Sequence, residues 1–328
     1  MIRVLAFSWS QADWGLLQPI VSALAESSDE LEVQVYPFTP EHEQHVSASA
    51  GAKVHVISPS FDQLLIGEPM STMFGSVASV VDMEFRNFIS ADHILLLGDR
   101  IQELAVATVA SCYHIPVHHL FSGDRSGSLD DRYRDAITML STCCYAFSKA
   151  AFIRTCGLAA ISGNKFSHEN VKMPEIEVSD EYVKQLAERG IKNFVLCRLH
   201  PETDTEEPVE DCIADVVRFS EKTGDYILWL PPNQEDGWQN ILTRWQEVEE
   251  AHYAISSVPV LPRDQYLGLL KAANLIVGNS SSFVHDAPLV GKEDIVQLIG
   301  SRQRKRSPMD TTGTAVIEAL KENMLCDS

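Results

Sequence analysis

The amino-acid sequence predicts an α/β protein made of two doubly wound domains with mainly parallel sheets. Short apolar runs alternate with longer amphipathic segments along the chain, which is typical of parallel sheets flanked by helices. The chain has 328 residues, enough for about two domains of ordinary size. The periodicity weakens from Gly157 to Pro174, which suits a linker. We therefore expect domains at 1–163 and 164–328, with a cleft between the carboxyl ends of their sheets, where such sheets bind ligands.

The first series of elements begins at the N-terminus and ends before the linker. Each expected strand is a short apolar run, and each expected helix is a longer segment with apolar residues on one face, as at Ile137 and Leu140. The expected strands are Ile2–Phe7, Leu31–Tyr36, Lys53–Ile57, His93–Leu97, Ile115–His119 and Cys143–Phe147. The expected helices are Trp14–Glu26, Met73–Phe88, Ile101–Tyr113 and Asp130–Leu140.

The second series repeats this alternation after the linker. Its expected strands are Phe194–Cys197, Tyr226–Leu230, Ile255–Leu261, Leu275–Val277 and Ile295–Ile299. Its expected helices are Ser179–Arg189, Val209–Glu221, Gly237–Glu250, Gln265–Ala272, Ser281–Val290 and Gly313–Asn323. The two halves share this architecture without an internal sequence repeat.

Composition indicates a packed protein with an acidic surface. Hydrophobic residues make up 45% and charged residues 22% of the chain, and the net charge is −20. This charge disfavours nucleic acid and anionic membranes as partners, although Arg302 to Arg306 form a local basic stretch. The seven cysteines lack CxxC spacing, and neither a signal peptide nor a membrane span is recognisable. We expect a cytoplasmic protein.

One candidate site residue follows a strand of the first domain. The run Leu95-Leu-Leu leads into Gly98, Asp99 and Arg100 just before a helix. A doubly wound sheet opens into its crevice at such a junction, so Asp99 would face a ligand. Alternatively, Asp99 caps the helix by accepting hydrogen bonds from its first N–H groups.

Two further candidates lie at strand ends of the second domain. Gly278-Asn-Ser-Ser-Ser282 precedes a helix, where hydroxyl groups and free amides suit a phosphate or diphosphate. Asp286 follows and could take a sugar diol, or it could lie on a solvated face. His200 comes directly after the first strand of this domain, at the rim of the expected cleft. The alternatives are a serine-rich helix cap and a structural histidine.

A glycine-bearing loop and an acidic, arginine-rich helix follow the fifth strand. Gly123 to Gly127 lead into a helix start that contains Asp130, Asp131 and Arg134. Carboxylates beside cations can transfer protons, or they can simply form a cap and surface ion pairs.

Several other site types lack support in the sequence. His118 and His119 alternate faces if they lie in a strand, so the two cannot share a metal. The sequence contains no Walker A, GxGxxG, HExxH, GxSxG or kinase motif. We therefore expect neither a metal nor a cofactor.

Taken together and in order, these segments resemble the UDP-N-acetylglucosamine 2-epimerase family, especially its hydrolysing branch. The matching segments are Ser10–Pro19, Leu97–Arg100, Leu129–Thr138, His200–Thr203, Gly278–Ser282, Ala287–Pro288 and Gly300–Gln303. The resemblance implies a fold of two facing Rossmann-like domains of the glycosyltransferase-B type. In this fold type the final helix can cross back to the first domain, which the sequence leaves open.

The resemblance also implies roles for individual residues. Ser280, Ser281 and Ser282 would bind the diphosphate of UDP and Asp286 its ribose, with Arg302 as charge compensation. Proton transfer at C2 of the sugar would fall to Asp99, Asp131 and Asp124, and His200 would lie by the leaving phosphate. The sugar side would also contain Gln11, Asp13, Arg100 and Arg134. A homodimer is expected, associating through first-domain helices; the sequence offers only the apolar residues Met73, Phe74, Val77, Val80 and Val81.

Two positions depart from the family pattern. Gln11 replaces an arginine, which removes a fixed charge and a bidentate grip on an anion. In the family's His-x-Gly-Gly-Glu element the acid is shifted by one position to Asp124, with Gly123 in the place of the glutamate. The leading hypothesis is a hydrolysing 2-epimerase that gives N-acetylmannosamine and UDP. The alternatives are a UDP-sugar glycosyltransferase with a retooled acceptor site and a UDP-sugar-binding regulator without turnover.

Overall fold

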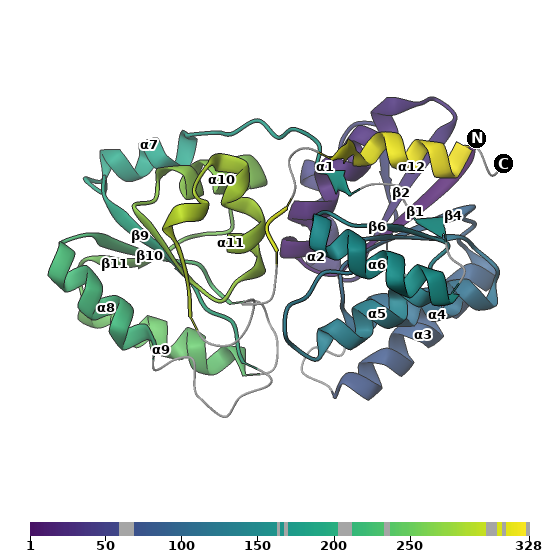
Figure 1. Cartoon of the computed structure of the whole chain (residues 1–328). Helices are drawn as coiled ribbons and strands as arrows, with labels where there is room; N and C mark the ends of the chain where they lie inside the picture. Colours follow the sequence, from purple (N-terminus) through teal and green to yellow (C-terminus); the bar gives the residue numbers. More distant parts are fainter. Residues whose placement is uncertain are drawn as a thin grey trace. The chain divides into compact units, whose positions relative to one another are not determined.

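The computed structural model describes residues 1–58, 69–162, 165–166, 170–202, 212–232, 237–299, 307–309 and 313–325. The chain forms two compact units, which are treated separately below (Figure 1). Unit 1 comprises Met1–Asp124, Asp130–Glu175 and Asp310–Ser328, and unit 2 comprises Arg125–Leu129 and Ile176–Met309. The predicted boundary residue Gly163 lies outside the described residues.

Unit 1 is built on a parallel sheet with the strand order β3-β2-β1-β4-β5-β6-β7. Its strands are β1 (Ile2–Ser8), β2 (Leu31–Pro37), β3 (Val54–Val56), β4 (His93–Leu97), β5 (Val117–Leu120), β6 (Cys143–Tyr145) and β7 (Lys165–Phe166). In register, Val4 of β1 pairs with Val33 on one side and with His93 on the other. The strand order reverses between β1 and β4, which is where doubly wound sheets bind ligands.

Helices cover both faces of this sheet. One side carries α3 (Met70–Asn87), α4 (Ile101–Cys112) and α5 (Asp130–Leu140), and the other carries α1 (Gln11–Ser27) and α12 (Val316–Leu325) (Figure 1). Alternate residues of a strand point to opposite faces, so Leu5 and Phe7 join the core under α3 and α4. The remaining helices are α2 (Pro40–Ser49) and α6 (Lys149–Ser162).

The end of the chain belongs to unit 1. The short strand β14 (Thr314–Ala315) pairs in parallel with β8 (Val171–Lys172). Before it, a Cβ on Gly313 would lie 2.2 Å from the Asn170 carbonyl oxygen, so only glycine fits this approach. α12 then packs on α1, where the Lys321 ammonium donates to the Ser27 carbonyl at 3.1 Å.

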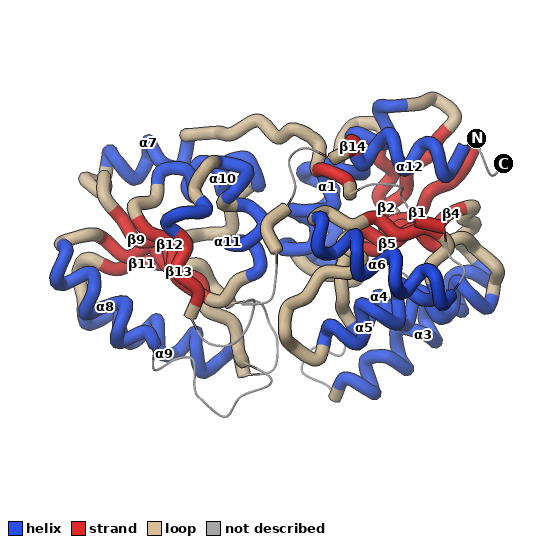
Figure 2. The backbone as a smooth tube through the Cα atoms, viewed as in Figure 1, coloured by secondary structure: helices blue, strands red, loops and turns tan. Residues whose placement is uncertain are grey.

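Unit 2 is a second doubly wound sheet, with the order β11-β10-β9-β12-β13 (Figure 2). Its strands are β9 (Phe194–Arg198), β10 (Tyr226–Trp229), β11 (Ile255–Ser257), β12 (Leu275–Gly278) and β13 (Val296–Leu298). Its helices are α7 (Glu181–Glu188), α8 (Cys212–Thr223), α9 (Trp238–Ala251), α10 (Arg263–Ala272) and α11 (Ser281–Asp286). Trp229 and Trp245 stack in the core beneath α8 and α9. The order reverses between β9 and β12.

Some elements differ from the prediction. The first residues of the expected linker, Gly157 to Ser162, belong to the helix α6, and α2 was not predicted. The strand expected at Ile255–Leu261 ends at Ser257. The helix expected at Ser281–Val290 ends at Asp286, and a 3-10 turn at Pro288–Val290 follows, because proline interrupts helical hydrogen bonding. No helix in the described ranges is long and apolar enough to cross a membrane.

Candidate active site

The first polar cluster joins the ends of β1 and β4 in unit 1. Arg100 Nε donates to Asp13 Oδ2 at 2.8 Å, and Arg100 Nη2 donates to Ser10 Oγ at 3.2 Å. Ser10 caps α1 and donates its hydroxyl to Asp13 at 2.7 Å. The structure thus brings together two residues predicted for the sugar side, Asp13 and Arg100. Gln11 begins α1 and is exposed.

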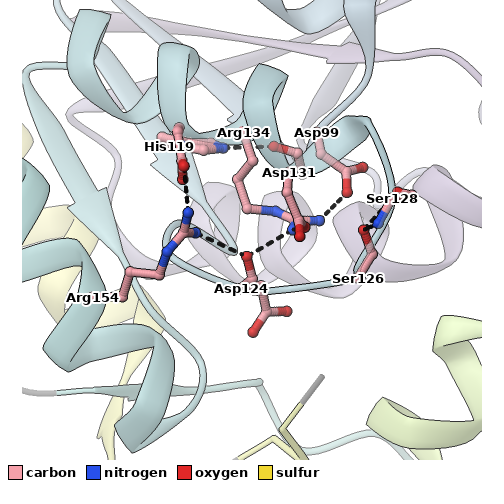
Figure 3. Close-up of polar contacts among 10 residues, drawn as sticks. Asp99, His119, Asp124, Ser126, Ser128, Asp131, Arg134 and Arg154 are labelled. Carbon is pink, nitrogen blue, oxygen red and sulfur yellow. Dashed lines mark hydrogen bonds and ion pairs between the residues drawn. The ribbon is translucent and has the colours of Figure 1, made fainter. Parts of the chain in front are cut away.

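A second cluster surrounds the buried Arg134 of α5 (Figure 3). Its guanidinium pairs with Asp99, which follows β4, and with Asp131 Oδ1 at 3.1 Å. It also donates to the Asp124 carbonyl at 2.8 Å, whereas the Asp124 carboxylate points away from Arg134 (Figure 3). Four predicted residues therefore lie close together: Asp99 after β4, Asp124 in the loop after β5, and Asp131 and Arg134 in the first turns of α5.

The charge of Arg134 is secured by these neighbours. Burial opposes a charged guanidinium, but the carboxylates of Asp99, Asp124 and Asp131 outweigh burial and raise the pKa of Arg134. A fixed cation therefore contacts two carboxylates inside the unit. Charge-assisted hydrogen bonds of this kind are stronger than those between neutral groups.

Packing explains the displaced acid in the loop after β5. Gly123 has φ of +73°, and a Cβ there would lie 2.2 Å from the Ala151 carbonyl oxygen of α6. No side chain fits at position 123, and the acid of this loop stands beside it, at Asp124. The sequence did not single out Arg154, which donates to the Asp124 carbonyl at 3.4 Å and pairs with Asp135.

Two further buried groups of unit 1 escaped the sequence analysis. His119 of β5 places Nε2 2.7 Å from the Gly98 carbonyl, and burial lowers its pKa to about 4. Glu103 of α4 accepts from the Leu97 N–H at 3.4 Å, and burial raises its pKa well above the usual range. His119 had been set aside with His118 as a non-metal residue. The position of His119 at the end of an expected strand is the feature that could have marked it as a site residue.

In unit 2 the ends of β9 and β12 are joined through His200 and Asn279. The His200 N–H donates to Asn279 Oδ1 at 2.6 Å, and Asn279 Nδ2 donates back to the His200 carbonyl at 2.8 Å. These bonds fix the backbone on which the His200 ring is carried. His200 itself is 4% exposed, so its ring is held within the unit.

Hydroxyl groups continue this network along the serine loop. His200 Nε2 lies 3.2 Å from Ser280 Oγ, and Ser280 Oγ lies 2.8 Å from Ser282 Oγ. Tyr266 of α10 donates its hydroxyl to Ser282 at 3.0 Å. Ser281 begins α11 and is partly exposed. His200, Ser280 and Ser282, all predicted, therefore share one hydrogen-bond network, which Tyr266 extends beyond the prediction.

Asp286 is held by a residue that the sequence did not indicate. It is 1% exposed and pairs with Arg263 of α10, with Oδ1 2.6 Å from Nη2. Its carboxylate is therefore buried in an ion pair. The alternative, that Asp286 lies on a solvated face, is wrong. Arg302, the other residue predicted for the nucleotide side, lies outside the described residues.

Within the described part of the chain, no three His, Cys, Asp or Glu side chains group so as to hold a metal ion. The described clusters consist of carboxylates, arginines, hydroxyl groups and one histidine. Carboxylates beside a fixed cation suit proton transfer, and hydroxyl donors beside a histidine suit a phosphate.

Comparison with known proteins identifies the family of the chain. Residues 44–319 match the family model described as UDP-N-acetylglucosamine 2-epimerase. The chain belongs to the UDP-N-acetylglucosamine 2-epimerase family. The match covers most of the chain, including the residues around Arg134 in unit 1 and the serine loop in unit 2, but not the first loop with Ser10 and Asp13. The predicted family is confirmed.

Relatives of this 2-epimerase family member cover nearly its whole length. A UDP-N-acetylglucosamine 2-epimerase of Neisseria meningitidis is 26% identical, with 93% of this chain and 81% of the relative aligned. A UDP-N,N'-diacetylbacillosamine 2-epimerase (hydrolyzing) of Legionella pneumophila is also 26% identical, with 98% and 89% aligned.

Solved structures confirm the predicted fold class. The UDP-GlcNAc 2-epimerase of Neisseria meningitidis bound to UDP-GlcNAc has a TM-score of 0.70 at 14% identity, covering 98% of this chain and 91% of that one. A UDP-bound transferase of Siraitia grosvenorii has a TM-score of 0.53 at 8% identity, covering 100% and 92%. The chain therefore has two Rossmann-like domains of the glycosyltransferase-B type.

Proposed function

We propose that this family member is a hydrolysing 2-epimerase that converts UDP-N-acetylglucosamine and water into N-acetylmannosamine and UDP. The observation that carries this proposal is the cluster of Asp99 and Asp131 on the buried Arg134, beside Asp124, at the ligand-binding edge of the first sheet. Two relatives named as hydrolyzing epimerases, from Legionella pneumophila and Campylobacter jejuni, support the hydrolysing reaction.

The reaction has two stages. In the first, a carboxylate takes the proton from C2, the C1–O bond to UDP breaks, and a glycal forms. In the second, water adds its oxygen to C1 and C2 regains a proton on the opposite face. A C2–H is a poor acid, so both stages need positioned acid and base groups and a neutralised leaving group.

We assign the proton transfers at C2 to the carboxylates of Asp99, Asp131 and Asp124. Arg134 stays charged through both stages because three carboxylates raise its pKa, and it holds two of them in fixed positions. Asp13 and Arg100 form the ion pair that ties the first loop to α4 on the sugar side. His200 stabilises or protonates the leaving phosphate.

UDP binding is assigned to unit 2. The hydroxyl groups of Ser280, Ser281 and Ser282 would donate to the diphosphate, and Asp286 with its partner Arg263 would lie by the ribose. Arg302 would compensate the negative charge of the diphosphate.

Calorimetric titration with UDP tests this assignment. Ser281→Ala removes a partly exposed hydroxyl group, and losing one hydrogen bond to a charged group should weaken binding about tenfold or more. Ser256→Ala, on the edge strand β11, is the control and should bind UDP like the wild type. Undiminished binding in Ser281→Ala, or wild-type protein that binds no uridine nucleotide, would contradict the site.

A UDP-sugar glycosyltransferase is the second candidate. Gln11, which is exposed where the family has an arginine, favours this reading because the first loop lacks the charge of that arginine and its bidentate grip on an anion. The displacement of the acid at Gly123 no longer favours it, because packing against Ala151 forces glycine there and Asp124 retains an acid in the loop.

We also infer a homodimer and a cytoplasmic location, from the family resemblance and the composition. The apolar residues of α3 that the sequence offered for the interface do not support the dimer. Val77 and Val81 are buried in the core of unit 1, and Met73, Phe74 and Val80 pack against it.

A further inference from the structure

The turn that carries Asp99 is held by hydrogen bonds from two sides. The Gly98 N–H donates to the Leu120 carbonyl at 3.0 Å, and the Leu97 N–H donates to Glu103 Oε1 at 3.4 Å. The Gly98 carbonyl lies 2.7 Å from Nε2 of His119. The last contact involves the peptide group that joins Gly98 to Asp99. Rotation of this peptide would therefore move Asp99 relative to Arg134.

The contacts of His119 define its protonation state. A carbonyl oxygen only accepts, so Nε2 carries the proton and donates to Gly98. Nδ1 then accepts from the Thr138 hydroxyl, 3.1 Å away in α5. The ring is fully buried. Its pKa is lowered to about 4, because burial and the charge of Arg134 outweigh the hydrogen bond to Gly98 and the charge of Asp99, which both raise it. His119 is therefore neutral near pH 7, with both nitrogens engaged.

We propose that His119 is a positioning residue that aims Asp99 at C2 of the sugar by holding the Gly98 carbonyl, without exchanging a proton with the substrate. The inference rests on the proposed role of Asp99. It also gives Thr138 a function, because its hydroxyl fixes the ring that fixes the turn. A displacement of about 1 Å at a reacting group can cost about 100-fold in rate.

Two conservative variants separate this role from acid–base catalysis. The side-chain nitrogen of His119→Gln can reach the position of Nε2 and donate to Gly98, whereas that of His119→Asn reaches only the position of Nδ1. We expect kcat within about tenfold of wild type for the glutamine variant and a loss of about 100-fold for the asparagine variant. KM and the affinity for UDP should stay unchanged in both.

The pH profile of kcat is the first measurement that can contradict the positioning role of His119. The glutamine variant should keep both limbs of the wild-type profile, because His119 does not titrate near pH 7. A missing limb, or an equal loss of kcat in both variants, would overturn the positioning role.

Nitrogen-15 NMR of histidine-labelled protein tests the contact without turnover. The ring signal that disappears in His119→Gln belongs to His119, and it should show a neutral ring with the proton on Nε2 at pH 6 to 8. A proton on Nδ1, or protonation within this range, would overturn the proposal. Wild-type protein that releases no UDP would instead contradict the proposed reaction, while the ring signal would still support or overturn the contact with Gly98.

Discussion

At the scale of single residues, buried ionisable groups set how this protein responds to pH. Glu103 is 1% exposed, and burial, assisted by the charge of Asp13, raises its pKa well above the usual range. Above about pH 4.3 the unfolded chain releases this proton while the folded chain retains it. Stability is therefore lost as pH rises, by up to about 1.4 kcal/mol per pH unit, until the folded pKa is reached.

Replacing the acid with an uncharged isostere should remove this loss. The free energy of unfolding of Glu103→Gln, measured in urea, should exceed that of the wild type by an amount that grows from about pH 5 to 7. Glu318→Gln, in the first turn of α12, is the control, because the Glu318 side chain is exposed. A difference between Glu103→Gln and wild type that stays constant with pH would show that Glu103 titrates normally.

The sequence predicted residues whose roles follow from strand ends and motif order. Asp99, Asp131 and Arg134 come together as expected, because the ends of β4 and β5 and the start of α5 meet at one edge. The contact between Arg263 and Asp286 and the contact between His119 and Gly98 were not predictable. Each joins residues more than twenty positions apart through a single side chain, and no local pattern marks such a pair.

At the scale of elements, Gly278 controls how closely β9 and β12 approach. Its φ is +153°, and a Cβ would lie 1.9 Å from the Arg198 carbonyl oxygen. Gly278→Ala should push the two strands apart and displace the serine loop that follows. We expect a loss of stability well above 1 kcal/mol and weaker UDP binding.

Gly291→Ala is the matched control for this substitution. Gly291 has φ of +66° with open space around it, so alanine there adds backbone strain of about 1 kcal/mol and no clash. Urea unfolding and UDP calorimetry of both variants make the comparison. Equal losses of stability and normal UDP binding in both would contradict the close approach of the strands.

Element predictions succeeded where apolar periodicity was strong. The central strands of both sheets lie where they were expected, because fully buried parallel strands are continuous apolar runs. α6 escaped because its buried stripe consists of the small residues Ala151, Thr155 and Ala159, which do not stand out as an apolar face. α2 escaped because it is short and polar, and its start is marked only by the capping Thr39 and by Pro40.

At the scale of the whole molecule, each unit places its polar cluster at the reversal of its own strand order. In unit 1 the reversal lies between β1 and β4, and in unit 2 between β9 and β12. The sequence predicted candidate residues at strand ends of both domains, but not the strand orders. The return of the final segment to unit 1 was not predictable, because it depends on a two-residue strand and on the fit of Gly313 against Asn170.

The central claim is that the chain hydrolyses UDP-N-acetylglucosamine with inversion at C2. Its most direct test is NMR of UDP-N-acetylglucosamine incubated with the purified protein in heavy water, without any acceptor. Free N-acetylmannosamine with deuterium at C2, formed in equal amount with UDP, is the predicted result. UDP-N-acetylmannosamine without free UDP, UDP release only after an acceptor is added, or product without deuterium at C2 would contradict the claim.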